Sequence, residues 1–275
     1  MKPLSPKKRR VYVWVFVALF FFSVPIALLY AGGYRYKPGF GLVETGGIFL
    51  SVPYSDATAY LNGKVVGRSS ILNKNFYIDD LAPSAYVLHV VRASSTPWYK
   101  TVVVEPKIVT EARATLVPED IEVMRLVRGT TSSPTSRAVA TRLYDAYREA
   151  FRTAATTTAD IGSKSDVDIV VRKGDIFAVW TQSGKKPSDN FCESPSRCVQ
   201  EFSIEHGKQT AISVGFFGSG VVYATKEGGV FFSEIDVRPT PVTAPLYPYH
   251  DVDMRVVDGT LIVKNGNTLY EIGRF

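Results

Sequence analysis

Residues 57–70 read ATAYLNGKVVGRSS, and this stretch decides the fold of the first half of the chain. Two short apolar runs flank the dipeptide Asn62-Gly63. This dipeptide is the strongest short-range hairpin signal, because both residues tolerate the positive φ angles of a type I′ turn. A ligand-binding loop is the alternative interpretation, but the turn chemistry explains the stretch without a ligand. The sequence therefore predicts the corner of a small β-domain.

The sequence on both sides of this corner has the same texture. Short runs rich in β-branched and aromatic residues are separated by Gly, Pro, Asn or Asp, a pattern typical of strands. The runs read GIFLSV, NFYIDDL, AYVLHVVRA, KTVVVEP and EARATLVP. Together with the hairpin they predict a compact antiparallel β-sandwich over residues 46–118.

The order of these runs resembles a PEGA domain, a small β-sandwich of prokaryotic surface and envelope proteins. The matching positions lie in the first strand and around the hairpin corner: Gly47, Ser51, Pro53, Ala59, Tyr60, Leu61, Gly63 and Gly67. The chain departs from the family pattern in PYSDAT, which replaces Pro-Glu-Gly-Ala, in Asn62, where Asp is usual, and in RSS, which replaces Thr-Pro. The resemblance covers about a quarter of the chain. It implies a non-catalytic module at the cell surface and supplies no catalytic residues.

The net positive charge of the chain is concentrated at its N-terminus. The formal net charge is +6, and residues 1–32 contain five basic residues and no acidic one. The remaining 243 residues carry 27 basic and 26 acidic side chains, so they are close to neutral. Because nucleic-acid binding needs a basic surface, we expect no nucleic-acid partner.

An uncharged run, VYVWVFVALFFFSVPIALLYA, occupies residues 11–31. At about 1.5 Å per residue, a helix of this length spans roughly 31 Å, the thickness of a bilayer's hydrocarbon core. A buried core helix of this length would show a polar face, and this run has none. A cleavable signal peptide is the competing interpretation, but Leu29 fits the small-residue cleavage pattern poorly. The sequence therefore predicts an uncleaved signal-anchor that crosses the membrane once.

Basic residues directly precede this run: Lys7, Lys8, Arg9 and Arg10. By the positive-inside rule they orient the helix, so residues 1–10 form a cytoplasmic tail and the bulk of the chain is extracytoplasmic. We expect the protein in the plasma (inner) membrane, with the lipid bilayer as its first partner. Residues 32–45, which are rich in Gly and aromatic residues, are expected to form a short tether.

The chain contains two cysteines, Cys192 and Cys198, separated by five residues. In an oxidising compartment they would form a disulfide that closes a small loop. A zinc site would need four ligands, and the nearest histidine stands alone. A pair of free thiols is the remaining alternative.

Residues 119–165 differ from the β-rich sequence on either side. Pro134 stands at a favourable first helical position, and a helix is predicted to about residue 153 within a longer linker. An apolar stripe recurs at helical spacing: Val139, Leu143, Tyr147, Ala150 and Phe151. The stripe is expected to pack on a neighbouring domain, and a partner-binding or surface-lying helix is the alternative.

Residues 166–275 return to a β pattern with repeated hairpin signals such as Lys173-Gly174 and Asn265-Gly266. These units resemble blades of a β-propeller, but about 110 residues are too few for the four blades that closure needs. Three arrangements fit the pattern: a partial propeller-like sheet, an independent sandwich, or one contribution to a ring built by a homo-oligomer. The predicted fold class is therefore mainly β, with one transmembrane helix and one connecting helix.

No acid, base or nucleophile set stands out in the sequence, so we expect no catalytic residue, no bound cofactor and no metal site. The sequence favours a non-enzymatic, membrane-anchored protein that acts in surface display, binding or envelope organisation. The expected partner is an envelope protein or a polysaccharide, with the exposed aromatics Trp98 and Tyr99, or the disulfide loop, as the contact candidates. The alternative is an envelope enzyme, or an accessory subunit of a cell-wall or secretion complex, whose site lies in the C-terminal region.

Overall fold

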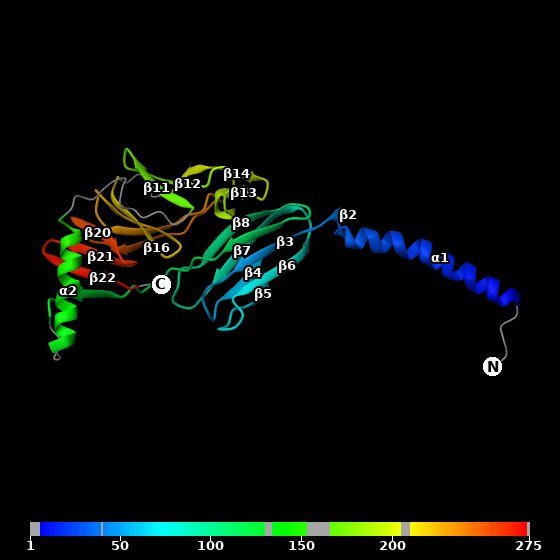
Figure 1. Cartoon of the computed structure of the whole chain (residues 1–275), viewed down its shortest axis with the longest axis horizontal. Helices are drawn as coiled ribbons and strands as arrows, with labels where there is room; N and C mark the ends of the chain where they lie inside the picture. Colours follow the sequence, from blue (N-terminus) through cyan, green and yellow to red (C-terminus); the bar gives the residue numbers. More distant parts are fainter. Residues whose placement is uncertain (1–5, 40, 130–133, 153–165, 205–209, 274–275) are drawn as a thin grey trace.

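A computed structural model describes residues 6–39, 41–129, 134–152, 166–204 and 210–273. Figure 1 shows an elongated molecule with three parts in a row: an isolated helix at one end, a β-sandwich in the middle and a second β-rich region at the other end. The predicted fold class is confirmed, since the described chain is mainly β with one N-terminal apolar helix and a second, shorter helix.

The N-terminal helix α1 (Pro6–Ala31) buries none of its side chains against the rest of the protein. It is long and apolar enough to cross a membrane, a test that a signal sequence would also pass. The four basic residues at positions 7–10 lie in its first turns, so the helix begins before the apolar run does.

A short antiparallel hairpin follows α1, formed by β1 (Tyr34–Lys37) and β2 (Gly41–Glu44). The tether predicted for residues 32–45 is therefore partly ordered as strands. The short runs on either side of the glycines pair with each other, and β2 leads directly into the first strand of the sandwich.

The sandwich consists of a three-stranded and a four-stranded sheet, of strand order β6-β3-β9 and β5-β4-β7-β8. The strands are β3 (Gly46–Ser51), β4 (Thr58–Leu61), β5 (Lys64–Arg68), β6 (Asn75–Leu81), β7 (Ser84–Val91), β8 (Trp98–Val104) and β9 (Val109–Arg113). All pairs are antiparallel as predicted except one: β9 crosses to the other sheet and runs parallel to β3.

The predicted hairpin corner is confirmed. Asn62 and Gly63 adopt φ angles of 47° and 77°, the left-handed values that a type I′ turn requires. The Asn62 side chain also accepts a hydrogen bond from the backbone N–H of Val87 at 2.8 Å, which ties the corner to β7. Gly67 lies so close to the ring of Phe76 that a Cβ at this position would come within 2.7 Å of it.

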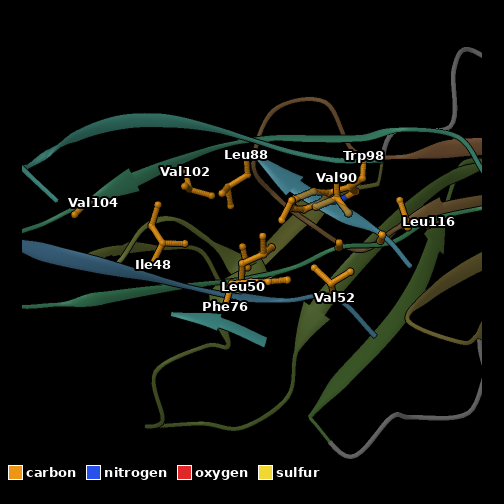
Figure 2. Close-up of a cluster of buried hydrophobic side chains, with 14 residues drawn as sticks. Ile48, Leu50, Val52, Phe76, Leu88, Val90, Trp98, Val102, Val104 and Leu116 are labelled. Carbon is orange, nitrogen blue, oxygen red and sulfur yellow. The ribbon is translucent and has the colours of Figure 1, made fainter. Parts of the chain in front are cut away.

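The core of the sandwich lies between its two sheets. Figure 2 shows Ile48, Leu50 and Val52 facing Leu88 and Val102 of the opposite sheet. These five side chains are fully buried. Burial of each such aliphatic side chain contributes roughly 1.5–3 kcal/mol to the stability of the domain.

The C-terminal region contains three antiparallel sheets and a two-stranded hairpin, β13-β14. The sheet orders are β11-β12-β15, β16-β17-β18-β19 and β10-β22-β21-β20. Their strands are β10 (Val123–Leu126), β11 (Val167–Arg172), β12 (Asp175–Trp180), β13 (Cys192–Ser194), β14 (Arg197–Cys198), β15 (Glu201–Ser203), β16 (Ala211–Phe217), β17 (Gly220–Thr225), β18 (Val230–Glu234), β19 (Thr243–Tyr247), β20 (Val252–Val257), β21 (Thr260–Asn265) and β22 (Thr268–Ile272). One turn of 3₁₀ helix, η1 (Asp189–Phe191), precedes β13.

These sheets stack face to face. Every residue of β17 is buried, because Val222 packs toward the third sheet while Val221 and Tyr223 pack toward the first. The described strands form three such sheets, fewer than the four blades that a closed propeller needs, so the resemblance to propeller blades stays a prediction.

Strand β10 pairs with the last strand, β22, so residues 123–126 belong to this region and not to the predicted linker.

The second helix, α2 (Pro134–Ala150), covers the outer face of the third sheet. Tyr147 packs there against Ile262 and Leu269, as the expected packing stripe requires. The stripe is narrower than predicted, because Val139 and Leu143 are exposed.

Candidate functional site

Two polar junctions join the three parts of the molecule, and the first lies between α1 and the sandwich. The guanidinium of Arg35 in β1 stacks on the ring of Tyr30 in the last turn of α1, 3.6 Å from the ring centroid. Its Nη1 donates a hydrogen bond to the Tyr30 carbonyl oxygen at 2.8 Å. Its Nε lies 3.0 Å from the carboxylate of Asp80 at the end of β6. A single side chain therefore contacts the end of the helix and the sandwich.

The base of the β1–β2 hairpin strengthens the same junction. Thr45 donates hydrogen bonds to the Gly33 carbonyl from both its backbone N–H and its hydroxyl, at 2.9 and 3.0 Å. Lys107 pairs with Glu44 at 2.7 Å, and the hydrogen bonds from Lys107 and Tyr34 lower the pKa of the Glu44 carboxyl. The segment predicted to be a tether is thus fixed at both ends.

The second junction, between the sandwich and the C-terminal region, is a buried ion pair. The ammonium of Lys100, on the inner face of β8, lies 2.9 Å from a carboxylate oxygen of Glu234 at the end of β18. The Lys100 side chain is 0% exposed and that of Glu234 is 5% exposed. The other carboxylate oxygen accepts a hydrogen bond from the indole N–H of Trp98 at 3.1 Å. The backbone N–H of Val242 donates to the first oxygen at 3.2 Å.

A second buried pair continues this network. Arg238 donates from Nε and Nη2 to the carboxylate of Asp236, with a shortest distance of 2.7 Å, and Asp236 lies 3.7 Å from Lys100. Burial alone would lower the pKa of the Arg238 guanidinium, but the hydrogen bonds and charge of Asp236 raise it. Two cations and two carboxylates therefore balance inside the junction, as buried charges require.

The same junction covers the free edge of β9. In a parallel ladder, alternate residues direct both backbone polar groups away from the neighbouring strand, and Glu111 is such a residue. Its N–H donates to the Asp189 carboxylate at 2.8 Å, and its C=O accepts from Arg238 Nη1 at 2.9 Å. Two charged side chains of the C-terminal region thus occupy the place of a pairing strand and block edge-to-edge association.

A polar cleft of about 440 Å³ lies beside this covered edge, between the outer face of the three-stranded sheet and the C-terminal region. Its sandwich side includes Phe49, Glu111 and Arg113, and its opposite wall includes Asn190 and Ser219. Aromatic, carboxylate, guanidinium, amide and hydroxyl groups are all present. These groups offer hydrogen-bond donors and acceptors and one aromatic ring, so we take the cleft as the candidate binding site.

The predicted disulfide between Cys192 and Cys198 is confirmed. It cross-links β13 and β14, and the loop that it closes lies against the sandwich, where the hydroxyl of Ser196 donates to the carboxylate of Glu105 at 2.7 Å. Hydrogen bonds from Ser194 and Ser196 lower the pKa of that carboxyl. The disulfide loop therefore takes part in the second junction.

The two predicted contact aromatics have opposite orientations, because successive side chains of a strand point to opposite faces. The prediction for Trp98 is wrong: it is 0% exposed and its ring lies in the sandwich core. Tyr99 is 49% exposed and stays a predicted contact residue. Its ring stacks on His89 at 4.0 Å, and His89 stacks on Tyr60 at 5.3 Å, so the three rings form a row on the solvent face of the sheet.

Sequence reasoning missed the charged residues of both junctions. One signal was available for Lys100: it lies between Trp98 and Val102 at alternate positions of a strand whose alternate residues are apolar, so it shares their buried face. Glu234 and Asp236 are also two positions apart, but this spacing does not identify Lys100 as their partner.

Comparison with protein-family models and with curated proteins finds no match to the chain. Within the described part of the chain, no three His, Cys, Asp or Glu side chains lie together in a way that could hold a metal ion.

Proposed function

We propose that this chain is a single-pass, membrane-anchored extracytoplasmic protein that acts in surface display, binding or envelope organisation. In this proposal α1 remains in the plasma membrane, with Lys7, Lys8, Arg9 and Arg10 on the cytoplasmic side. The PEGA-like sandwich is a non-catalytic spacer, and the C-terminal region is presented farthest from the membrane.

The observation that carries this proposal is the contact of Arg35 with both Tyr30 and Asp80. A cleavable signal peptide leaves the mature protein, so its last turn has no reason to form part of the mature fold. Here the last turn of α1 shares hydrogen bonds with the hairpin and, through Arg35, an ion pair with the sandwich. This arrangement favours retention of α1 as an anchor.

Display and binding are supported by the second junction. The ion pair of Lys100 with Glu234 holds the C-terminal region in a fixed orientation on the sandwich. The polar cleft lies between these two parts, so a ligand bound there would contact both of them. An envelope protein or a polysaccharide is the class of partner that we assign to the cleft and to the exposed ring of Tyr99.

Two measurements on cells that express the full chain test the proposal. The mass of the protein extracted from the membrane fraction should include residues 1–31, and alkaline carbonate should not release it. An impermeant maleimide should label Cys192 and Cys198 in intact cells only after reduction. A soluble protein that begins after residue 31 would refute the anchor, and labelling only after lysis without reductant would refute the orientation.

A further inference from the structure

We infer that the tip of the β1–β2 hairpin is a lipid-contacting surface, with Tyr36 and Leu42 entering the headgroup region of the non-cytoplasmic leaflet. This inference rests on the proposed function, because it requires that α1 crosses the membrane. It adds a second contact of the protein with the bilayer, made by the ectodomain itself.

The first argument is the exposure of a matched apolar pair. Tyr36 and Leu42 are directly opposite each other in the hairpin, and they are 77% and 55% exposed. Side chains opposite each other in an antiparallel pair lie on the same face, so the two form one continuous surface. The hairpin has few other side chains, so this apolar surface stays exposed in the folded chain.

The second argument is the direction of the hairpin. Its base, the pair of Tyr34 with Glu44, is held at the sandwich by Lys107, which pairs with Glu44 at 2.7 Å. The pair of Tyr36 with Leu42 lies two residues farther along each strand. At about 3.3 Å per residue, it projects roughly 6–7 Å away from the sandwich.

The third argument is the level at which this pair lies. Arg35, the residue before Tyr36, contacts the ring and the carbonyl oxygen of Tyr30. The hairpin therefore lies beside the last turn of α1, where the apolar run ends and the headgroups of a spanned bilayer would begin. Tyr30 is itself 64% exposed at this level.

The chemistry of the tip fits a lipid interface and commits it to that partner. Tyrosine places an apolar ring against acyl chains and a hydroxyl among headgroups, and it is enriched at this depth. Leu42 adds aliphatic surface, and Lys37 can direct its ammonium group to lipid phosphate. A protein partner would have to reach this pair between the bilayer and the sandwich.

The experiment uses the full chain in phosphatidylcholine vesicles that contain one-fifth phosphatidylglycerol. A spin label is attached to Leu42→Cys or, in a second variant, to Tyr36→Cys, while the native cysteines stay in their disulfide. The accessibility of each label to oxygen and to a water-soluble nickel chelate gives its depth. The control is Leu72→Cys, because Leu72 is 98% exposed in the β5–β6 connection, at the end of the sandwich opposite the hairpin.

Compared with the label at position 72, the labels at positions 42 and 36 are expected to be much less accessible to the nickel chelate and more accessible to oxygen. Equal accessibility at all three positions, in protein that stays with the vesicles, would overturn the lipid-contacting hairpin and leave the anchor intact. Loss of the protein from the vesicles after carbonate treatment would overturn the anchor and, with it, this inference.

Discussion

Replacing Lys100 by Met should destabilise the protein more than any single surface change, because it removes one half of a buried ion pair. The substitution keeps most of the volume of the side chain and deletes the ammonium group that lies 2.9 Å from Glu234. The Glu234 carboxyl group, whose side chain is 5% exposed, then has the N–H groups of Trp98 and Val242 as its remaining hydrogen-bond donors among the described residues. Breaking a buried pair in this way costs about 3–5 kcal/mol in the free energy of unfolding.

A double variant separates the charge from the packing. In Lys100→Met with Glu234→Gln, the stranded charge is gone and the amide oxygen can still accept one of the two N–H donors. We expect the double variant to recover about 1–3 kcal/mol relative to Lys100→Met alone, the cost of a buried polar group without its partner. The two substitutions are therefore strongly non-additive.

The matched control is Lys107→Met, which deletes the same group from an exposed pair. The Lys107 side chain is 57% exposed, although its distance to Glu44 is only 2.7 Å. Its loss should cost at most about 1 kcal/mol. Urea unfolding of the full chain in detergent micelles, followed by circular dichroism and tryptophan fluorescence, measures five proteins: the native chain, Lys100→Met, Glu234→Gln, the double variant and Lys107→Met. A cost below about 1 kcal/mol for Lys100→Met, or additivity in the double variant, would refute the reasoning.

Three further predictions concern single features of the two β-rich parts. Asn62→Ala should lower the free energy of unfolding in urea by about 1–2 kcal/mol. Alanine adopts the left-handed φ of 47° less readily than asparagine, and the substitution removes the hydrogen bond from the N–H of Val87. Replacing Cys192 and Cys198 by Ser should lower the stability of the C-terminal region by about 2 kcal/mol, the loop-entropy value for a sequence separation of 6, read from its melting temperature. Burial lowers the pKa of His89, so the unfolded chain binds its proton first and the stability should fall as the pH drops below about 6.5; His89→Gln should flatten that slope.

The sandwich could be predicted from the sequence because its signals are local. The Asn62-Gly63 turn, the alternation of apolar residues and the short loops each depend on neighbours in the chain, and each is found as expected. The pairing of β10 with β22 could not be predicted, since it joins residues 123–126 to residues 269–272. Edge strands without a distinctive pattern show their partner only in the folded chain.

The orientation of Trp98 was predictable in part. Adjacent strand residues point to opposite faces, so Trp98 and Tyr99 could not both be exposed contacts, and the apolar neighbours of Trp98 at alternate positions indicated the buried face. The cleft was not predictable, because its two walls are brought together by contacts between residues more than a hundred positions apart, such as Lys100 with Glu234.

Both junctions between the parts of the molecule are formed by charged side chains with several partners. Arg35 connects α1 to the sandwich, and Lys100 connects the sandwich to the C-terminal region. Apolar contacts alone would hold these parts together with little preference for direction, whereas an ion pair with hydrogen-bonded partners is satisfied in one geometry. Loss of the Arg35 contacts should therefore change the angle between α1 and the sandwich without unfolding either part. Small-angle scattering of the Arg35→Ala variant would show this as a change in overall dimensions at unchanged circular dichroism.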